Sequence, residues 1–481
     1  MRRFPKSVIW FAGLMFTAAN VVAQSNHPAS AKKAVDGSQG AAANAASGAR
    51  VIKPLPPDPQ IVQAMEDVSA EELRASVEKL ASFGTRLTLT ADVPASSGKG
   101  IAASRDWIKT EFERHSKACG GCLEVKTDTL TVEKTERIPQ RTEITNVYAV
   151  LRGSDPENAK RVVLVSGHYD SRASDVLDKD ALAPGANDDG SGTAVALEAA
   201  RVLSKYKFPA TIIFLAVAGE EQGLNGSRHF AKIAKEQGWV IEAVLNDDTV
   251  GGDKSPGQKP WLRVFSEGLP LAGTLEEWRR IRMLGTENDS PSRQLARFIT
   301  EVAEQYGKDV VEPKMIFRQD RFLRGGDHTA FNEQGFAAVR LTEWRENYDR
   351  QHQNVRSENG IEYGDLPKFV DFNYLANVAR LNTATLASLA VAPAPPAQVR
   401  ILTKNLENDT TLSWQASPGG LATGYEVLWR PTTSATWEFV KSVGNVTEAT
   451  LPESKDNVIF AVRAVDAKGH RSLAVVPVPE R

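Results

Sequence analysis

The sequence predicts two kinds of fold in one chain. The first is an α/β unit with a mostly parallel or mixed central sheet flanked by helices, and an all-β sandwich follows it. Up to about residue 390, apolar runs of strand length alternate with helical patterns, which is typical of α/β architecture. Beyond a Pro-rich stretch at 391–396, the helical patterns vanish and alternation with period two takes over. A length of 481 residues also exceeds one ordinary domain.

The amino-terminal residues predict export. Arg2, Arg3 and Lys6 precede an apolar stretch over 8–22, and Val21-Val22-Ala23 is a plausible cleavage site, so we expect a signal peptide over 1–23. The apolar stretch is short for a membrane span and no charged stop follows it, which disfavours an uncleaved anchor. Residues 24–57 are rich in Ala, Ser, Gly and Asn and predict a disordered leader. The expected location is secreted or periplasmic.

Helical spacing begins near Pro59, where the expected first domain, 58–390, starts. Apolar residues share helical spacing in two stretches: Ile61, Met65, Leu73, Val77 and Leu80, and then Ile101, Trp107, Ile108 and Phe112. Strand patterns follow over 123–132 and 146–151. These helical and strand patterns all precede the part of the chain that carries the candidate functional residues.

Strand and helix patterns then alternate through the middle of the chain. Residues 162–165 predict a buried strand, 192–203 a helix, and 241–245 and 337–341 two further strands. The run 210–218 is almost wholly apolar, as expected for a central strand covered on both faces. Ser227 is the expected cap of the helix that follows.

The only two cysteines lie close together, in Cys119-Gly120-Gly121-Cys122. In an exported protein this spacing predicts a small structural disulfide loop. A redox-active pair is the alternative. A zinc site needs more ligands than two cysteines supply.

The last part of the chain, 397–481, has strand patterns over 411–414, 424–429 and 458–465. It resembles a fibronectin type III domain, because Trp414 and Tyr425 match the aromatic residues of its second and third strands and 460–466 matches its sixth. Val458 stands where many members carry a tyrosine. We expect this sandwich to be an accessory module, a candidate for binding a protein or glycan. A chain ending near Leu389 is expected to fold and to keep the activity of the first domain on small substrates.

The charge balance limits the partners. The chain has 58 Lys and Arg against 60 Asp and Glu, a formal net charge of -2. This balance disfavours a general binder of nucleic acid or of acidic membranes. We expect no nucleic acid and no stable membrane insertion.

Hard metal ligands gather at the ends of the apolar runs and in Gly-rich turns, where an α/β sheet binds its ligands. Hydrolytic zinc prefers His and carboxylate ligands, and two zinc ions about 3.5 to 4 Å apart share a bridging group. Two histidines and three carboxylates would give each metal three contacts. Two zinc ions also balance the charge of three carboxylates and a hydroxide. The candidates, in chain order, are His168, Asp188, Glu220, Glu221, Asp247, Asp248 and His352.

Four ordered motifs resemble those of the dizinc aminopeptidases of metallopeptidase family twenty-eight. They are His168-Tyr169-Asp170, the segment 185–192 (GANDDGSG), Gly219-Glu220-Glu221 with the segment 223–227 (GLNGS), and Asn246-Asp247-Asp248. The resemblance covers roughly residues 60–390. It implies that His168 and Asp248 bind one zinc, that Glu221 and His352 bind the other, and that Asp188 bridges. It also implies Glu220 as the general base and Asp170 as the acceptor that holds His168.

The expected function is that of an exported zinc-dependent aminopeptidase with two zinc ions per chain. It would hydrolyse N-terminal residues from peptides with a free amino terminus, through a hydroxide shared by the metals and the base Glu220. Asp189 is expected to be structural, and His328 to belong to the pocket or to support the ligands. The alternatives are a carboxypeptidase or glutaminyl cyclase of the same fold, or a non-catalytic receptor-like domain.

Overall fold

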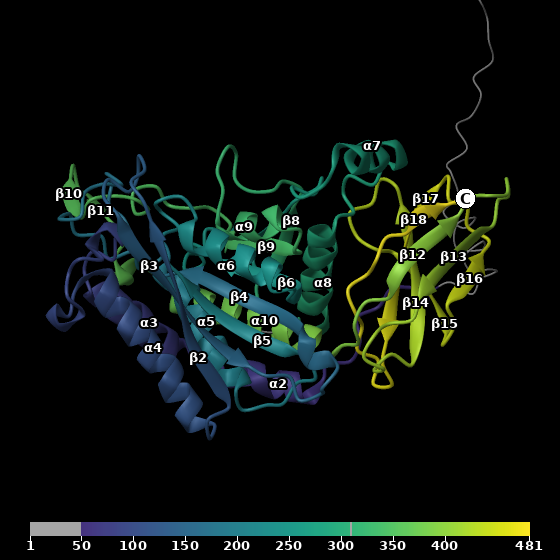
Figure 1. The fold of residues 1–481 in the computed structure, drawn as a ribbon, viewed down its shortest axis with the longest axis horizontal. Coiled ribbons are helices and arrows are strands. Elements are labelled where there is room, and N and C mark those ends of the chain that lie inside the picture. The colour runs from purple at the N-terminus through teal and green to yellow at the C-terminus, as the bar shows by residue number, and fades with distance from the viewer. Residues whose placement is uncertain (1–49, 308–309) are drawn as a thin grey trace, which may run out of the picture. The chain divides into compact units, whose positions relative to one another are not determined.

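A mixed eight-stranded sheet is the centre of the first part of the chain (Figure 1). The computed structural model describes residues 50–307 and 310–481. Strands β5, β4, β6 and β9 run parallel to one another. The pairs β2–β3, β3–β5 and β9–β7 are antiparallel, and β8 pairs parallel with β7. The strands, in sheet order, are β2 (Leu123–Val132), β3 (Thr142–Leu151), β5 (Thr211–Val217), β4 (Arg161–His168), β6 (Val240–Asp247), β9 (Ala338–Glu343), β7 (Trp261–Ser266) and β8 (Glu312–Ile316). The predicted α/β class is confirmed.

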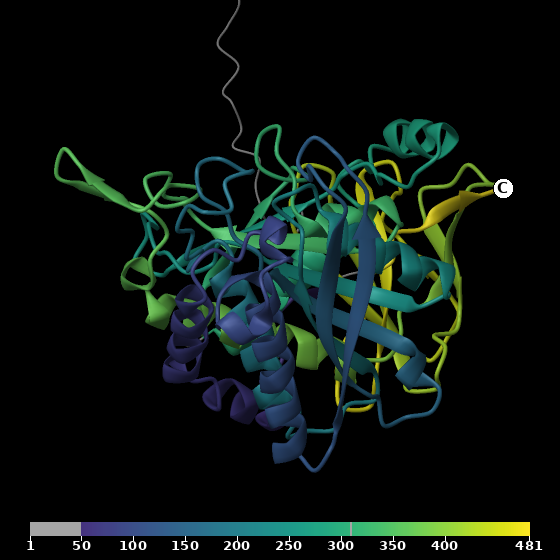
Figure 2. The same ribbon diagram turned by 60° about the vertical axis from the view of Figure 1, so that its left-hand side comes forward.

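Helices cover both faces of this sheet. Alternate residues of β4 point to opposite faces, so that Val163 and Val165 belong to one apolar core and Leu164 to another. Figure 2 shows the purple and blue helices of the first part together on one side of the sheet. The first core includes α2 (Pro59–Glu66), α3 (Ala70–Ser82), α4 (Gly100–Ala118), α5 (Gly190–Leu203), α8 (Pro291–Tyr306) and α10 (Phe372–Val391). The second includes α6 (Asn225–Glu236) and α9 (Asp327–Glu333).

Most expected elements around the site are present, with shifted ends. The strand over 123–132 has the expected bounds, and the helix expected over 192–203 begins at Gly190. The cap at Ser227 is wrong, because α6 already begins at Asn225. The N–H groups of Gly223 and Leu224 donate to the Glu220 carbonyl, so the turn after Glu220 leads directly into this helix. Segments that the sequence patterns did not single out include α7 (Leu275–Leu284), β10 (Arg356–Glu358) and β11 (Ile361–Tyr363).

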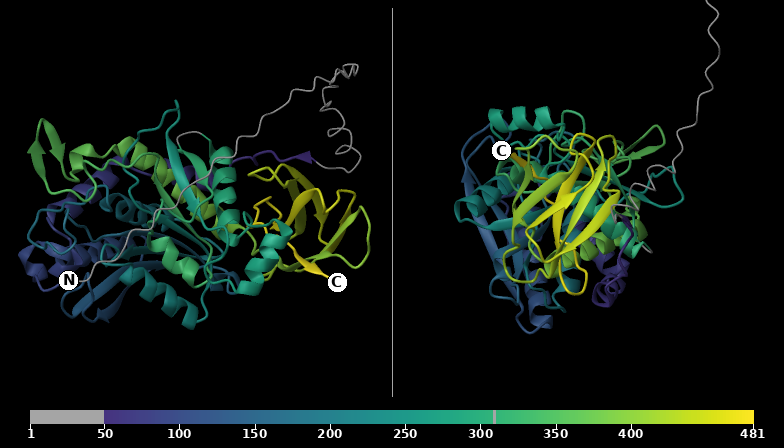
Figure 3. Two further views of the ribbon diagram at one scale, coloured as in Figure 1. Left: turned by 90° about the horizontal axis from the view of Figure 1, so that it is seen from above. Right: turned by 90° about the vertical axis from the view of Figure 1, so that its right-hand side faces the viewer.

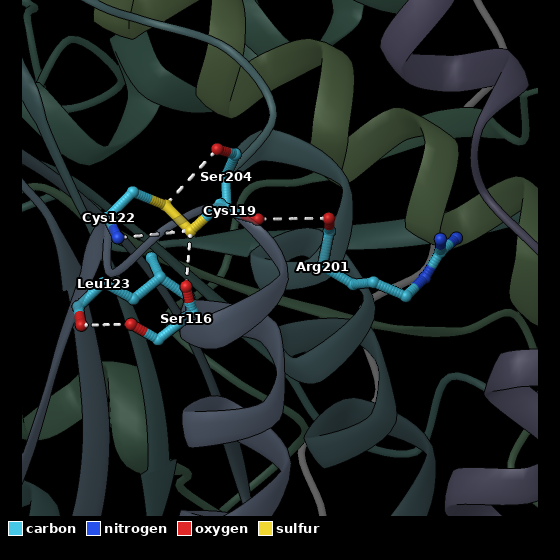
Figure 4. The surroundings of a disulfide bond; sticks show 6 residues. All are labelled: Ser116, Cys119, Cys122, Leu123, Arg201 and Ser204. Atoms are coloured by element: carbon cyan, nitrogen blue, oxygen red, sulfur yellow. Dashed lines mark hydrogen bonds between the residues drawn. A yellow bond between two sulfur atoms is a disulfide. The ribbon is translucent and has the colours of Figure 1, made fainter.

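Cys119 and Cys122 form the expected disulfide (Figure 4). The loop lies between the end of α4 and the start of β2. Cys122 Sγ lies 3.4 Å from the carbonyl oxygen of Ser204, just after α5. The Ser116 hydroxyl donates to the Leu123 carbonyl (2.8 Å). The disulfide therefore lies where α4, α5 and the first strand of the sheet meet.

The last part of the chain, in yellow in both views of Figure 3, supplies seven strands of two four-stranded sheets, and β1 from residues 50–51 is the eighth. Their shared core contains Trp414, Tyr425 and Trp429. One sheet has the order β1 (Arg50–Val51), β15 (Phe439–Gly444), β14 (Gly424–Pro431) and β17 (Val458–Val465). The other has the order β16 (Glu448–Leu451), β13 (Thr410–Gln415), β12 (Ala397–Leu402) and β18 (Val478–Glu480). The observed β-sheet pair agrees with the expected all-β unit.

The disordered leader expected over 24–57 does not extend to residue 57, because residues 50–51 form a strand that pairs antiparallel with β15. An edge strand offers unpaired N–H and C=O groups, and this short segment satisfies part of that edge. The remaining leader, 24–49, and the expected signal peptide, 1–23, lie outside the described residues. Among the described helices, none is both long and apolar enough to span a bilayer.

A buried ion cluster joins β14 and the segment after it to α8 and the residues just before that helix. Asp289 accepts two hydrogen bonds from Arg430 (2.7 and 2.8 Å) and lies 3.2 Å from Arg297. The Trp437 indole donates to Gln294 (3.1 Å). All five of these side chains are buried. The Pro-rich stretch at 391–396 therefore connects two units that also share a buried interface.

Candidate metal centre

The parallel strands bring the candidate residues to one edge of the sheet. His168 is the last residue of β4, and Asp247 is the last residue of β6. The segment 219–221 directly follows β5 and its neighbour Ala218. Because β5, β4 and β6 are parallel neighbours, their carboxyl ends lie together. The local strand pattern thus places three of the four motifs side by side.

The first group of candidate ligands contains His168, Asp188 and Asp248. His168 Nε2 lies 3.1 Å from Asp188 Oδ1 and 3.9 Å from Asp248 Oδ2. All three side chains are buried. These are the residues expected to hold the first zinc, with Asp188 as the bridge.

The second group contains Asp188, Glu221 and His352. His352 Nε2 lies 2.9 Å from Asp188 Oδ2 and 3.0 Å from Glu221 Oε1. His352 adopts a φ of 55°, a left-handed conformation that is unusual for a residue other than glycine. The structure therefore brings all five expected ligands together, and Asp188 belongs to both groups.

The loop around Asp188 is held by Asp365. The Asp365 carboxylate accepts the N–H groups of Asn187 (3.0 and 2.9 Å) and Asp188 (2.7 Å). Asp189 Oδ1 accepts the Gly192 N–H (2.8 Å) and caps α5, while its Oδ2 accepts the His168 N–H (3.0 Å). The expected structural role of Asp189 is confirmed. The peptide bond between Asp188 and Asp189 is cis.

Asp170 contacts His168 differently from the expectation. The Asp170 carbonyl oxygen lies 3.1 Å from His168 Nδ1, whereas Oδ1 lies 3.6 Å away, too far for a hydrogen bond. The carboxylate instead accepts the N–H groups of Glu220 (3.3 Å) and Glu221 (3.1 Å). In this geometry the carbonyl orients the His168 ring, and the carboxylate holds the turn that carries Glu220. The reason is local, because that turn offers two N–H groups at the end of β5.

Glu220 is half-buried at the floor of a cleft of about 760 Å³. Burial raises its pKa well above the ordinary value, and the carboxylates of Glu221, Asp327 and Asp248 act in the same direction. A raised pKa is what a proton-transferring carboxylate requires near neutral pH. The position and environment of Glu220 are therefore compatible with the expected role of a general base.

Converging carboxylates favour positive charge at the two histidines. Burial alone would lower the pKa of His168, but Asp170 and Asp188 outweigh it and raise this pKa well above the usual range. Burial also acts to lower the pKa of His352, but Glu221 and Asp188 raise it to about 10. Among the described residues, Glu221 Oε1 makes no hydrogen bond of acceptable geometry, although His352 Nε2 lies 3.0 Å away. A buried site of this kind fits divalent cations, and three carboxylates and one hydroxide would balance the charge of two of them.

Three further side chains contact the candidate ligands or their loop. Arg340, fully buried, lies 2.7 Å from Asp248 Oδ2. Gln351 Nε2 donates to Asp188 Oδ2 (2.7 Å). Buried Arg86 donates to the Tyr169 (2.7 Å) and Gly185 (2.9 Å) carbonyls, on both sides of the site. These residues carry no local motif, apart from the position of Gln351 next to His352.

His328 does not line the cleft. It is fully buried near the start of α9, and its Nε2 lies 2.9 Å from the Gln319 carbonyl oxygen. His328 also lies 3.7 Å from Asp320, which is 3.8 Å from Arg340, the partner of Asp248. Of the two expected roles, a pocket residue does not fit the structure. The other, a residue that supports the ligands, agrees with this series of contacts from His328 to Asp248.

The mixed sheet and the His–carboxylate groups at its edge define an α/β protein with a candidate metal centre. The profile described as Peptidase family M28 matches residues 146–366. A probable zinc metalloprotease from Leptosphaeria maculans is 46% identical over 437 residues, which span 90% of this chain and 100% of that protein. A relative with the same description from Pyricularia oryzae is 43% identical, over 89% of this chain and 86% of that protein. The chain belongs to peptidase family M28.

The fold also occurs among solved structures. The LapA aminopeptidase of Legionella pneumophila is 21% identical, with a TM-score of 0.50 over 71% of this chain and 78% of that one. At this identity the match describes the fold, a sheet with flanking helices. The class of zinc metalloprotease, a peptide hydrolase, thus rests on the family and on its close relatives.

Proposed function

We propose that the chain is an exported aminopeptidase that holds two zinc ions and removes N-terminal residues from peptides. The observation that carries the proposal is the position of Asp188. One of its oxygens lies 3.1 Å from His168 and the other 2.9 Å from His352. A carboxylate shared in this way is typical of two-metal hydrolytic sites.

Each zinc would have three ligands from the chain, His168, Asp188 and Asp248 for one, and Asp188, Glu221 and His352 for the other. Bound zinc supplies Lewis-acid polarisation of the scissile carbonyl and makes water a stronger nucleophile. Arg340, 2.7 Å from Asp248, and Gln351, 2.7 Å from Asp188, orient the two carboxylates.

Glu220 would move the proton. Its carboxylate faces the cleft, and it takes a proton from the attacking water and returns it to the leaving amine. The Asp170 carboxylate fixes the backbone at Glu220 and Glu221 (3.3 and 3.1 Å), so that base and ligand keep a constant separation. The chain retains the base and all five expected ligands, which disfavours a non-catalytic receptor-like domain.

The choice of an aminopeptidase rests on the four motifs, in the order typical of the dizinc aminopeptidases, and the fold match to LapA agrees with it. Export rests on the charged start, the apolar stretch and the cleavage site in residues 1–23. For the sheets after residue 397, we propose an accessory fibronectin type III-like domain on the basis of Trp414 and Tyr425.

Hydrolysis of a substrate panel tests the function. Aminoacyl anilides and short peptides with a free amino group are compared with the same compounds after acetylation of that group, with and without a chelator. We expect cleavage only of amino-free compounds, loss with the chelator, and recovery with added zinc. Cleavage of acetylated peptides from the carboxyl end would indicate a carboxypeptidase. Cyclisation of N-terminal Gln without hydrolysis would indicate a glutaminyl cyclase.

A further inference from the structure

The charged residues that line the cleft are of two kinds. All four acidic ones belong to the candidate metal centre: Asp188, Glu220, Glu221 and Asp248. Away from these residues and His352, every charged lining residue is an arginine, namely Arg137, Arg172, Arg228, Arg321 and Arg324. Two zinc ions would neutralise most of the negative charge at the floor of the cleft. The walls would then present a positive field to an incoming substrate.

Three of the arginines are already paired with acids that do not line the cleft. Arg228 contacts Glu333 through two nitrogens (3.2 and 3.1 Å). Arg321 contacts Asp320 (2.9 Å) and Glu346 (2.8 Å), and Arg324 Nη1 lies 3.6 Å from Glu346 Oε2. These acids balance the charge of the three arginines.

Arg137 and Arg172 differ, because their hydrogen-bond partners are backbone carbonyl oxygens and not carboxylates. Arg137 Nη1 donates to the Glu221 carbonyl (3.1 Å). Arg172 donates to the carbonyls of Ala173 (3.1 Å) and Ser174 (3.2 Å), and its Nε is 3.9 Å from Glu221 Oε2. A guanidinium has five N–H donors, so both side chains keep donors for a ligand. Both lie on the side of the cleft where Glu221 and His352 meet.

A carboxylate is the ligand that suits this pair. The planar fork of arginine binds a carboxylate through two parallel hydrogen bonds, and these are stronger than hydrogen bonds between neutral groups. The Arg172 side chain is only 17% exposed, so its interaction with a bound anion is screened less than on an open surface.

We propose that Arg137 and Arg172 form a carboxylate-binding subsite that makes the enzyme prefer peptides with an acidic group beside the scissile bond. The proposal rests on the proposed aminopeptidase function and adds the substrate class. The carboxylate has two sources, the side chain of an N-terminal Glu or Asp, or the α-carboxylate of a dipeptide. Both place a negative charge within a few bonds of the cleaved amide.

Two pairs of substrates separate these sources in the zinc-loaded full-length enzyme. Glu-anilide is compared with Gln-anilide, which has the same shape without the charge. The dipeptide Leu-Gly is compared with Leu-Gly amide. We expect kcat/KM to be on the order of tenfold higher for the charged member of at least one pair, the size expected for one charged hydrogen bond. The pair that shows the preference identifies the source.

The variants Arg137→Gln and Arg172→Gln test the assignment. We expect each to reduce the preference for the charged substrate severalfold, through a lower kcat/KM for that substrate, with bound zinc unchanged. Arg114→Gln is the matched control, since Arg114 is 53% exposed on α4 and contacts Glu111 (2.7 Å), away from the cleft. Higher salt is also expected to weaken the wild-type preference.

Each of the following results would contradict one part of the proposal. Equal rates within both substrate pairs would overturn the subsite and leave the aminopeptidase intact. A preference that both arginine variants retain would overturn the assignment to these residues. Zinc loss in Arg172→Gln and Arg137→Gln, with the preference kept, would show that they only support Glu221. Failure to cleave any amino-free substrate, with zinc bound, would overturn the proposed function together with the subsite.

Discussion

Asp188 Oδ2 lies 2.9 Å from His352 Nε2, although His352 belongs to a loop that follows the last parallel strand of the sheet. Asp188 therefore connects the Gly-rich turn before α5 with a distant loop. Gln351, the neighbour of His352, donates to the same oxygen (2.7 Å). The second candidate metal position therefore depends on the place of this loop at the edge of the sheet.

Metal content tests the role of Asp188. We expect two zinc ions per chain after saturation and dialysis, and at most one in Asp188→Asn, because both groups lose an anionic ligand. Elemental analysis measures the stoichiometry. A wild-type value of one zinc would instead favour a single-metal, cyclase-like site.

Turnover tests the role of Glu220. Glu220→Gln keeps the size of the side chain and removes its basicity, so we expect zinc content to stay at the wild-type value and kcat to fall by about 10² or more. The control is Glu133→Gln, whose side chain is 79% exposed and should leave kcat unchanged. Near-normal turnover of Glu220→Gln with full zinc content would exclude it as the base.

Replacement of His352 and replacement of His328 should have different effects. His352→Ala is expected to lower zinc content with little loss of stability, because the side chain lies at the edge of the cleft. His328→Ala is expected to keep the zinc ligands but lower the free energy of unfolding by roughly 2 to 3 kcal/mol, since it empties a buried site. Zinc analysis and denaturant unfolding of both variants provide the comparison. Zinc loss in His328→Ala, with zinc retained in His352→Ala, would instead identify His328 as the ligand.

The interface with the last two sheets should contribute to stability. In Asp289→Ala, the buried guanidinium groups of Arg297 and Arg430 lose their carboxylate, so we expect unfolding to become easier by about 3 to 5 kcal/mol. Asp92→Ala breaks an exposed pair with Lys179 and should cost about 1 kcal/mol or less. For the same reason, a chain ending near Leu389 should be less stable than the sequence alone suggests. Equal unfolding curves for all these proteins would contradict a structural role of the interface.

Glu267 should make stability depend on pH. Burial raises the pKa of this carboxyl from 4.5 to about 7. The folded protein therefore favours the neutral form, and its contribution is fully present below about pH 4.5 and is lost as pH rises through 7. Between these limits we expect a loss on the order of 3 kcal/mol. Glu267→Gln, which keeps an oxygen for the Leu271 N–H, should flatten this part of the profile in denaturant unfolding at stepped pH. An unchanged slope would show that Glu267 titrates normally.

Local patterns were sufficient for the central strands and for the motifs that follow them. His168, the Asp188 turn and Glu221 each adjoin an apolar run, and neighbouring parallel strands carry their ends to one edge. The start of α6 could not be predicted in the same way. It depends on how the turn after Glu220 pairs its backbone groups, and Ser227 offered an equally good local cap.

The sequence by itself determined the α/β class and the candidate metal residues at the ends of strands, because these depend on short apolar runs and on residue types next to them. The roles expected for the five ligands and for Glu220 were implied by the resemblance of four ordered motifs to a known family. Only the tertiary structure decided that Asp188 lies between two histidines, that Arg340 and Gln351 contact its ligand set, and that Arg137 and Arg172 face the cleft. The physical reason is distance along the chain. Loop residues carry no periodic pattern, and their partners are selected by folding of the whole sheet rather than by their neighbours in sequence.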